Sequence, residues 1–379
     1  MSALTNTDEP LTMASTDTRF WFSGSYAATD VTILMKPISM DMTQVADKEA
    51  LIQDGTRHYS EMLSPESAPS PAYMAIYHDA LKANGAKLAQ HINTLAAALI
   101  NRSEARGRKN IIIVSLARAG TPIGVLLTRA LRRRVGNVEH YSMSIIRGRG
   151  IDVNALKYIL QSHDPQDIVF VDGWTGKGAI ATELRGKNGP WALGIEPFLV
   201  VVADPAGRAD LAATAEDYVI PSGILNGIVS GLVSRSVLND QIGPDDFHGT
   251  VVLEHLMDGD ISRTFVDEID ALTRTIGPQS DNRWSLEDCE ILSYECDKMV
   301  AEIALKYRVH DTNRIKPGIA ESTRAVLRRV PRRLLLGDVN DRELTHLVHL
   351  ASERGVTIEK LPGSSVYRAV AIIAAVGAE

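Results

Sequence analysis

One apolar run, which ends in an acid and a glycine-rich loop, constrains the fold of this chain more than any other feature. Residues 168–171 read Ile-Val-Phe-Val and lead directly into Asp172 and the loop 173–179, after which residues 180–185 have a helix-like pattern. Glycines let backbone N–H groups approach a phosphate closely, and a carboxylate accepts hydrogen bonds from ribose hydroxyls. The segment therefore predicts a buried strand that is followed by a cradle for a phosphate and a ribose.

Two common phosphate-binding motifs do not fit this loop. A Walker A loop needs Gly, four residues and then Gly-Lys-Ser/Thr, but Val171 stands five positions before Gly176, and Gly178 follows Lys177. A dinucleotide fingerprint needs a further glycine where Ala181 stands. Taken by itself, the segment is equally well explained as an ordinary strand-to-helix turn with a capping threonine.

A second segment of the same kind favours the functional interpretation. Residues 111–114 read Ile-Ile-Ile-Val, the loop 115–122 reads Ser-Leu-Ala-Arg-Ala-Gly-Thr-Pro, and residues 123–131 form an apolar helical run. In an open α/β sheet, ligands bind at loops that follow the carboxyl ends of the strands. The two loops together predict a site for a diphosphorylated ligand.

The centre of the chain alternates between strand and helix patterns, which predicts an α/β fold with parallel strands and right-handed crossovers. Before it, a strand is expected at 31–35 and a helix at 87–100, in an N-terminal helical extension. The expected core strands are 111–114, 141–146, 168–171, 198–203 and 218–220, and the expected core helices are 122–134, 153–162 and 178–186.

The two loops resemble the 5-phosphoribosyl 1-pyrophosphate (PRPP) motif and the pyrophosphate loop of type I phosphoribosyltransferases. More closely, the chain resembles a family of tellurite-resistance and stress gene clusters, which joins a phosphoribosyltransferase-like domain to a Pelota-type RNA-binding tail and is also labelled cysteine protease StiP. The matching stretches span nearly the whole chain; besides the two loops and the C-terminal segment they are 22–26, 57–62 and 147–152. The resemblance implies a parallel-sheet, phosphoribosyltransferase-like (Rossmann-like) core and a small C-terminal α/β domain.

The resemblance also implies a reaction, the transfer of a 5-phosphoribosyl group from Mg²⁺-PRPP to a base-like acceptor. Mg²⁺ would be bound mainly through PRPP, so no metal-ligating residue is expected. Catalysis would consist of holding the pyrophosphate leaving group and stabilising its charge. The candidate catalytic residues are Asp172, Arg147 and Arg149, and the candidate substrate-binding residues are Ser115, Arg118, Ala119, Gly120, Thr121, Gly173, Thr175, Gly176, Lys177, Gly178, Ala179 and Asp204.

One departure from the family pattern concerns the ribose. The usual PRPP motif carries two adjacent acids, whereas here Asp172 is followed by Gly173. Asp204, which follows the expected strand 198–203, is a candidate for the second acid, and a helix N-cap beside Pro205 is the alternative interpretation. A protein that senses a phosphoribosyl nucleotide without turnover, coupled to RNA binding, is the alternative function.

Two further segments have both a functional and a structural interpretation. Arg147 and Arg149, separated by glycines, are suited to fold over a pyrophosphate, or they form a solvated basic loop. Three glycines at four-residue spacing in 217–231 predict a helix with one glycine-lined face. Asp245 and Asp246, beside a histidine at position 248, are interpreted as a helix cap, with an Mg²⁺ site as the alternative.

The two cysteines do not favour a protease. Cys289 and Cys296 lie in the amphipathic acidic stretch 285–297, where neighbouring carboxylates raise the pKa of a thiol and so disfavour the thiolate that a cysteine nucleophile needs. Their spacing does not match a zinc ribbon. A cysteine protease is therefore the least supported of the three functions.

The chain is acidic overall but contains one arginine-rich segment. The net charge of −7 argues against a protein coated by nucleic acid, but residues 324–333 hold five arginines in ten positions. Four of them are RNA phosphate contacts in the Pelota interpretation and a solvated face otherwise; they are Arg328, Arg329, Arg332 and Arg333.

The expected domain organisation follows from composition and pattern. Residues 1–19 form a disordered tail, 20–318 the phosphoribosyltransferase-like domain and 319–379 the Pelota-like domain. The sparse cysteines and the lack of a signal or membrane-spanning run predict a cytoplasmic protein without a membrane partner. The expected partners are PRPP or a phosphoribosyl nucleotide, RNA, and a second copy of the chain in a homodimer.

Overall fold

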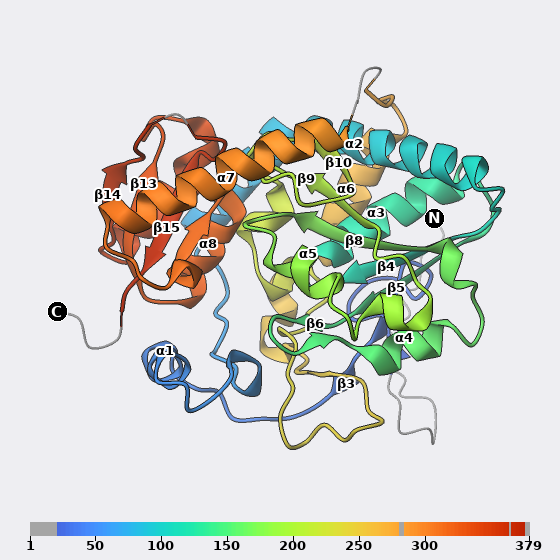
Figure 1. The fold of residues 1–379 in the computed structure, drawn as a ribbon, viewed down its shortest axis with the longest axis horizontal. Helices are drawn as coiled ribbons and strands as arrows, with labels where there is room; N and C mark the ends of the chain where they lie inside the picture. The colour runs from blue at the N-terminus through green and yellow to red at the C-terminus, as the bar shows by residue number, and fades with distance from the viewer. Residues whose placement is uncertain (1–20, 280–283, 364, 376–379) are drawn as a thin grey trace, which may run out of the picture.

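The computed structural model describes residues 21–279, 284–363 and 365–375, and the expected disordered tail 1–19 lies outside these described residues. It consists of a larger α/β body built on a seven-stranded sheet and a smaller C-terminal unit built on a four-stranded sheet (Figure 1). The order of strands in the large sheet is β1 (Trp21–Phe22), β2 (Thr32–Leu34), β5 (Val138–Met143), β4 (Ile111–Leu116), β8 (Ile168–Trp174), β9 (Leu199–Ala203) and β10 (Leu211–Thr214).

All neighbouring strands of the large sheet are parallel except the edge pair β1 and β2. This confirms the predicted α/β class with a parallel central sheet. The order places β4 and β8 side by side at the centre, so the two loops that follow them leave the same edge of the sheet. Both strands are buried along nearly their whole length, which explains their continuous apolar sequences.

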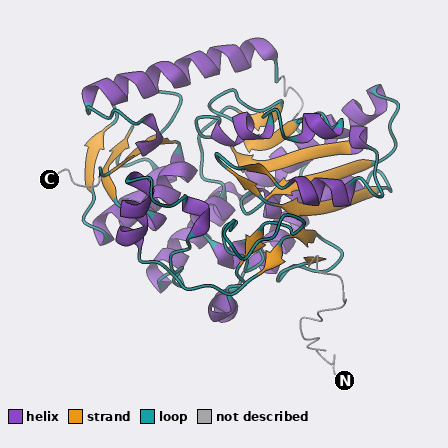
Figure 2. Cartoon of the chain, turned by 60° about the horizontal axis from the view of Figure 1, so that its bottom comes forward, coloured by secondary structure: helices purple, strands orange, loops and turns teal. Residues whose placement is uncertain are grey.

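Helices cover both faces of the large sheet (Figure 2). On one face, alternate strand residues such as Ile113 and Val171 pack against α2 (Pro71–Ala105), α3 (Gly120–Arg132) and α6 (Ser262–Thr273). On the other face, residues such as Val114 and Phe170 pack against α4 (Val153–Ile159) and α5 (Ala179–Leu184). The two layers hold the carboxyl end of β8 in a fixed position.

Two expected elements around position 220 are wrong. Residues 218–220 are not a strand, because the backbone of Val219 bonds to the side chains of Asn84 and Glu343 instead of to a neighbouring strand. The edge position is taken by β10, whose small residues carry little strand pattern. Nor does the glycine-spaced segment form an α-helix; it contains the 3₁₀ turns η4 (Pro221–Ile224) and η5 (Gly227–Val229).

The C-terminal unit has the sheet order β12 (Ile315–Pro317), β15 (Ala369–Ile373), β13 (Pro331–Leu336), β14 (Thr357–Lys360). β12 lies before residue 319, at which the sequence predicts this unit to begin. The C-terminal sequence also predicts strands at 333–336, 356–361 and 370–376 and a helix at 341–354, and these correspond to β13, β14, β15 and α9, with position 376 outside the described residues. Its helices are α8 (Ile319–Arg328) and α9 (Thr345–Glu353), and α7 (Leu286–Lys306) runs along it (Figure 1).

Contacts between the two parts are specific. Asp217, on the large body, accepts hydrogen bonds from the backbone N–H of Ile319 at 3.0 Å and of Arg368 at 2.8 Å, so it caps α8 of the small unit. On the other side, Arg329 forms an ion pair with Glu49 of α1 (Val45–Gln53). These contacts seat α8 opposite the carboxyl edge of the large sheet.

Candidate functional site

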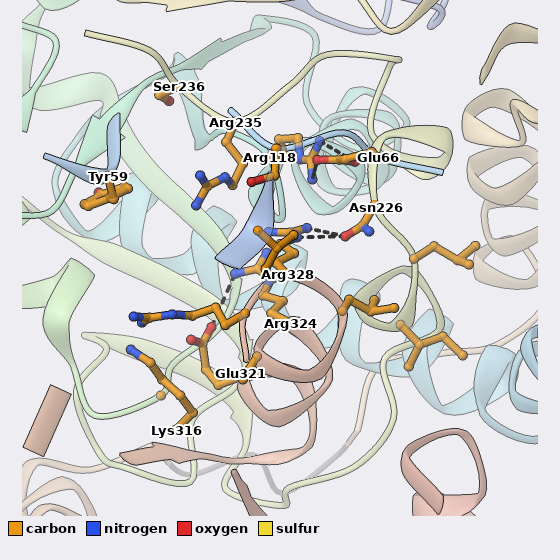
Figure 3. Close-up of a pocket in the computed structure, with 18 of the residues that line it drawn as sticks. Tyr59, Glu66, Arg118, Asn226, Arg235, Ser236, Lys316, Glu321, Arg324 and Arg328 are labelled. Atoms are coloured by element: carbon orange, nitrogen blue, oxygen red, sulfur yellow. Dashed lines mark hydrogen bonds and ion pairs between the residues drawn. The ribbon is translucent and has the colours of Figure 1, made fainter. Parts of the chain in front are cut away.

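A cavity of about 710 Å³ lies between the carboxyl edge of the large sheet and the C-terminal unit (Figure 3). Ten basic and five acidic side chains line it. Since the whole chain carries a net charge of −7, this excess of positive charge is a local feature that focuses a positive potential in the cavity. The cavity is suited to an anionic ligand.

Asp172, at the end of β8, is the acid on the sheet side of this cavity. Its carboxylate accepts the backbone N–H of Gly173 at 2.7 Å. Desolvation raises the pKa of Asp172 to about 7, and the nearby Arg324 guanidinium acts in the opposite direction. The carboxyl group therefore changes its charge near neutral pH, which is common for groups at functional sites.

The loop that follows Asp172 contains two glycines at positions where a Cβ atom would clash with other side chains of the protein. Gly178 has a φ of +86°, in the left-handed region, and a Cβ atom there would lie 2.7 Å from Arg208 Cγ. A Cβ atom on Gly176 would lie 2.9 Å from Glu321 Cγ, so this glycine is where the loop meets the C-terminal unit. Every residue from 174 to 181 lines the cavity.

The side chains of Thr175 and Asp204 hold the loop through a buried hydrogen bond. The Thr175 hydroxyl donates to the Asp204 carboxylate, which also accepts the backbone N–H of Ala206 at 3.2 Å and of Ala209 at 2.6 Å. Asp204 is fully buried and is not part of the cavity wall. In this arrangement Asp204 acts as a cap of its own loop, which is the structural interpretation that the sequence left open.

The candidate pyrophosphate loop is mostly engaged in internal contacts. The Ser115 hydroxyl lies 2.8 Å from His140 Nε2, and the Thr121 hydroxyl lies 2.8 Å from the Ser142 hydroxyl. Ala119 and Gly120 also lie outside the cavity wall. A Cβ atom on Gly120 would lie 2.3 Å from the carbonyl oxygen of Val171, so this glycine allows the loop to pack on β8.

Arg118 is the member of this candidate set that reaches the cavity, and it is already paired. Its Nη2 atom lies 2.8 Å from Glu66 Oε1, and its Nη1 atom donates to the Val233 carbonyl at 2.9 Å. Both partners of the ion pair are nearly buried, and Arg118 holds the pKa of Glu66 down to about 2. The arginine is therefore fixed in position before any ligand binds.

The two arginines of the 147–149 turn have different surroundings. They lie on the hairpin of β6 (Ile145–Ile146) and β7 (Gly150–Ile151). Arg147 lines the cavity, with its backbone N–H bonded to the Tyr59 hydroxyl at 2.7 Å. Arg149 is not part of the cavity wall and pairs with Glu61 at 3.0 Å.

The opposite wall comes from the C-terminal unit, which the sequence analysis did not include in the site. Glu321 accepts a hydrogen bond from the Trp174 indole at 3.3 Å, and the Arg324 guanidinium lies 4.5 Å from the Trp174 ring centroid. Lys316 also lines the cavity, and burial lowers its pKa to about 7. The spacing of Glu321, Arg324 and Arg328 places them on one helix face, a pattern that predicts a shared surface.

The C-terminal unit also holds the phosphate loop directly. The Tyr367 hydroxyl donates to the Gly176 carbonyl at 3.0 Å, and Lys177 Nζ donates to the Thr312 carbonyl. Burial, followed by the charge of Arg147, lowers the pKa of Lys177. The loop is thus clamped between the two parts of the chain.

The cysteines lie in surroundings that oppose a thiolate. Burial and the charges of Asp204 and Asp288 raise the pKa of Cys289 to about 11, as predicted in direction from the acidic sequence. Cys296 is buried with its sulfur 3.2 Å from the Tyr367 hydroxyl, and burial raises its pKa too. Within residues 21–279, 284–363 and 365–375, no hydrogen bond or ring contact joins a histidine to either cysteine.

The helix cap predicted from Asp245 and Asp246 is wrong, because the next element is the strand β11 (Gly249–Thr250), and Asp246 instead accepts the backbone N–H of Gly243 at 2.9 Å. Asp246 forms an ion pair with Lys36 at 2.7 Å, and His248 Nδ1 lies 2.7 Å from the Ser144 hydroxyl. Among the described residues, no cluster of three or more histidine, cysteine, aspartate or glutamate side chains is arranged to hold a metal ion. No helix in the described part of the chain has the length and apolar character needed to cross a membrane.

Comparison with known proteins gives matches over nearly the whole chain. A sequence model of the family described as "Tellurite-like stress resistance cysteine protease StiP" matches residues 24–270, and one described as "PELOTA RNA binding domain" matches residues 294–375. A protein named "Cysteine protease StiP" from Acinetobacter baylyi is 39% identical over 369 residues, which cover 94% of this chain and 95% of that protein.

Among solved structures, hypoxanthine phosphoribosyltransferase from Trypanosoma cruzi matches a smaller part of the chain. A variant of that enzyme in complex with its product IMP has a TM-score of 0.27 and 14% identity, over 34% of this chain and 66% of that one. Another structure of the enzyme has a TM-score of 0.28 and 13% identity, over 34% of this chain and 77% of that one.

Proposed function

The chain belongs to the StiP family of tellurite-like stress resistance proteins, and within that family we propose that it is a phosphoribosyltransferase, which transfers a 5-phosphoribosyl group from Mg²⁺-PRPP to a base-like acceptor. The observation that carries this proposal is the position of Asp172. It lies in a strongly basic cavity at the carboxyl edge of a parallel sheet, directly before a glycine-containing loop that lines the same cavity.

In the proposed complex, each part of the cavity binds one part of PRPP. Backbone N–H groups of the loop 176–179 meet the 5′-phosphate, and the ionised carboxylate of Asp172 accepts hydrogen bonds from the ribose hydroxyls. Mg²⁺ would arrive with PRPP and supply further positive charge at its pyrophosphate oxygens. Arg147 and Lys316 add positive charge from the hairpin and from the C-terminal unit.

The chemical step would depend on stabilising the leaving group. The bond between C1 of the ribose and the pyrophosphate oxygen breaks, the electron pair leaves with pyrophosphate, and C1 forms a bond to the acceptor atom, whose proton passes to water or to the departing pyrophosphate. Negative charge grows on pyrophosphate as the bond breaks, so fixed cations in a partly desolvated cavity lower the barrier. The C-terminal unit forms one wall of the cavity, which in the proposed complex would limit the access of water to the reacting carbon.

A second function, sensing of a phosphoribosyl nucleotide without turnover, is favoured by the contacts of the phosphate loop. Tyr367, Thr312 and Glu321 of the C-terminal half all touch this loop or its tryptophan. A ligand on the loop would therefore act on the seating of the C-terminal unit, whose match to a PELOTA RNA binding domain makes RNA a proposed partner.

The activity named for the Acinetobacter relative is not our proposal for this chain. A cysteine protease needs a thiolate activated by a nearby base. Both thiols here have raised pKa values, and Cys296 is fully buried. These surroundings favour structural cysteines.

Isothermal titration with Mg²⁺-PRPP tests the proposal, with a pyrophosphate-release assay over a panel of bases. We expect saturable binding that Asp172→Asn weakens at least tenfold, while Asp245→Asn, an acid outside the cavity wall, leaves it unchanged. Binding together with release of pyrophosphate supports the transferase, and binding without release supports the sensor. A folded protein that does not bind PRPP contradicts both.

A further inference from the structure

We propose that Lys48, Arg235 and Arg328 form a second phosphate-binding subsite in the cavity, separate from the loop 175–179. The inference rests on the proposed function because it assumes that the cavity binds a phosphorylated ligand. The subsite would bind a further phosphate group, either of that ligand or of a second ligand beside it. Lys48 belongs to α1, Arg235 to the segment after η5, and Arg328 to the end of α8. The fold brings these three distant positions to the lining of one cavity, in which Figure 3 shows Arg235 and Arg328.

Arg235 carries a charge that the protein does not neutralise by direct contact. Within the part of the chain that the structure describes, its guanidinium makes neither a hydrogen bond nor an ion pair, and it lies 5.7 Å from the Tyr59 ring centroid. Burial lowers its pKa and the neighbouring Arg118 lowers it further, while the charge of Glu66, which is paired with Arg118, acts in the opposite direction. A desolvated guanidinium without a carboxylate is costly unless a ligand supplies the negative charge.

Arg328 is held by a neutral group. Its Nε atom donates to the Asn226 side-chain oxygen at 2.9 Å, and Nη2 donates to the same oxygen. No carboxylate among the described residues forms an ion pair with it, and burial together with Arg118 lowers its pKa well below the usual range. The amide fixes the orientation of the guanidinium without neutralising it, which leaves its charge available to a ligand.

Lys48 is the third basic residue of the proposed subsite. Its Nζ atom donates to the Met62 carbonyl, and burial together with the charges of Arg235 and Arg328 lowers its pKa to about 6. All three side chains line the same cavity, and the charges of Arg235 and Arg328 both disfavour the charged form of Lys48. An anion bound between them would remove the repulsion and favour the protonated form of Lys48.

Two other arginines that line the cavity are neutralised by carboxylates. Arg118 is paired with Glu66 at 2.8 Å, and Arg329 is paired with Glu49. After these pairs are formed, Arg235 and Arg328 have no carboxylate partner among the described residues, and Lys48 becomes a third cation when a bound anion favours its protonated form. A surplus of this size matches a phosphate or diphosphate better than a single carboxylate, and guanidinium groups form paired hydrogen bonds to phosphate oxygens.

Titration with inorganic pyrophosphate tests the subsite without PRPP. We expect Arg235→Met and Arg328→Met to weaken pyrophosphate binding at least tenfold, and to change the affinity for ribose 5-phosphate by less than threefold. Arg332→Met is the matched control, because it removes an exposed arginine of the same C-terminal unit that lies outside the cavity wall. The melting temperature of each unliganded variant is measured in parallel to establish that the protein is folded.

Two results overturn the subsite: a wild-type protein that does not bind pyrophosphate, and folded Arg235→Met and Arg328→Met variants that bind it as the wild type does. If the subsite exists, competition identifies the source of its phosphate. Saturating pyrophosphate that excludes PRPP assigns the subsite to the pyrophosphate end of PRPP, whereas simultaneous binding assigns it to a phosphorylated second ligand. A protein that binds pyrophosphate through Arg235 but does not bind PRPP keeps the subsite and removes the proposed transferase.

Discussion

The loops after β4 and β8 have similar sequences and leave neighbouring strands, but they have different roles in the structure. The loop after β8 lines the cavity along its whole length, and the C-terminal unit packs on it. In the loop after β4, the side chains of Ser115 and Thr121 are used in buried hydrogen bonds, and Arg118 is paired with Glu66. A small-residue loop after a strand thus permits a binding site, and the partners of its side chains decide whether one is formed.

The largest expected effect comes from the glycine that packs the first loop on β8. Gly120→Ala would place a Cβ atom 2.3 Å from the Val171 carbonyl oxygen, so backbone must move and we expect a loss of about 3 kcal/mol or more in the free energy of unfolding. Gly173→Ala is the control in the second loop, where the nearest atom would be 3.4 Å away and the expected loss is below about 1 kcal/mol. Urea denaturation followed by circular dichroism measures both, and equal midpoints would contradict the distinction between the loops.

The next effect concerns the ion pair that occupies Arg118. Glu66→Gln leaves a nearly buried guanidinium without its carboxylate, so we expect a loss of about 2–3 kcal/mol at pH 7. Because the folded pKa of Glu66 is about 2, below its ordinary value of 4.5, the stabilisation is present above pH 4.5 and is lost as the pH falls towards 2. The difference between variant and wild type should therefore shrink at pH 3, and a difference independent of pH would contradict the role of the ion pair.

For the second loop, Asp172→Asn is expected to raise the free energy of unfolding, whereas the two preceding substitutions lower it. The folded pKa of about 7 lies above the ordinary value of 3.8, so the wild type loses stability as the pH rises from about 4 to 7. The variant does not titrate, and we expect it to be more stable than the wild type by about 1–2 kcal/mol at pH 8, with a smaller gain at pH 5. Thermal melts at both pH values measure this gain, and a variant that is less stable at pH 8 would show that the carboxylate has a structural role.

The fold could be predicted from sequence where burial alone decides the pattern. β4 and β8 are covered on both faces, so their apolar runs are unambiguous. The sequence does not predict β10, because Leu-Ala-Ala-Thr has small side chains at a sheet edge. The apolar residues 218–220 predict a strand, but side chains of Asn84 and Glu343 satisfy the backbone of Val219.

Half of the candidate site could be predicted in the same way. Asp172 and its loop are continuous in sequence, and the glycines of the loop indicate that other atoms pack closely against its backbone. The wall formed by Lys316, Arg324 and Arg328 depends on how α8 docks on the large body, and no local pattern contains that information. The arginines are evident in the sequence, but their spacing shows only that the side chains lie on one face of a helix. The hydrogen bond from the start of α8 to Asp217 helps to determine which surface that face packs against.

The smallest expected effect separates the two arginines of the β6–β7 hairpin. Arg147 lines the cavity, whereas Arg149 is not part of the cavity wall and forms an ion pair with Glu61. We expect Arg147→Met to weaken Mg²⁺-PRPP binding about tenfold, which is about 1.4 kcal/mol, and Arg149→Met to change it less than twofold. Neither should change the free energy of unfolding by more than about 1 kcal/mol, because the Arg149 pair is partly exposed to solvent and Arg147 forms no ion pair among the described residues. Equal losses of affinity would mean that the hairpin closes over the ligand and brings Arg149 into the cavity.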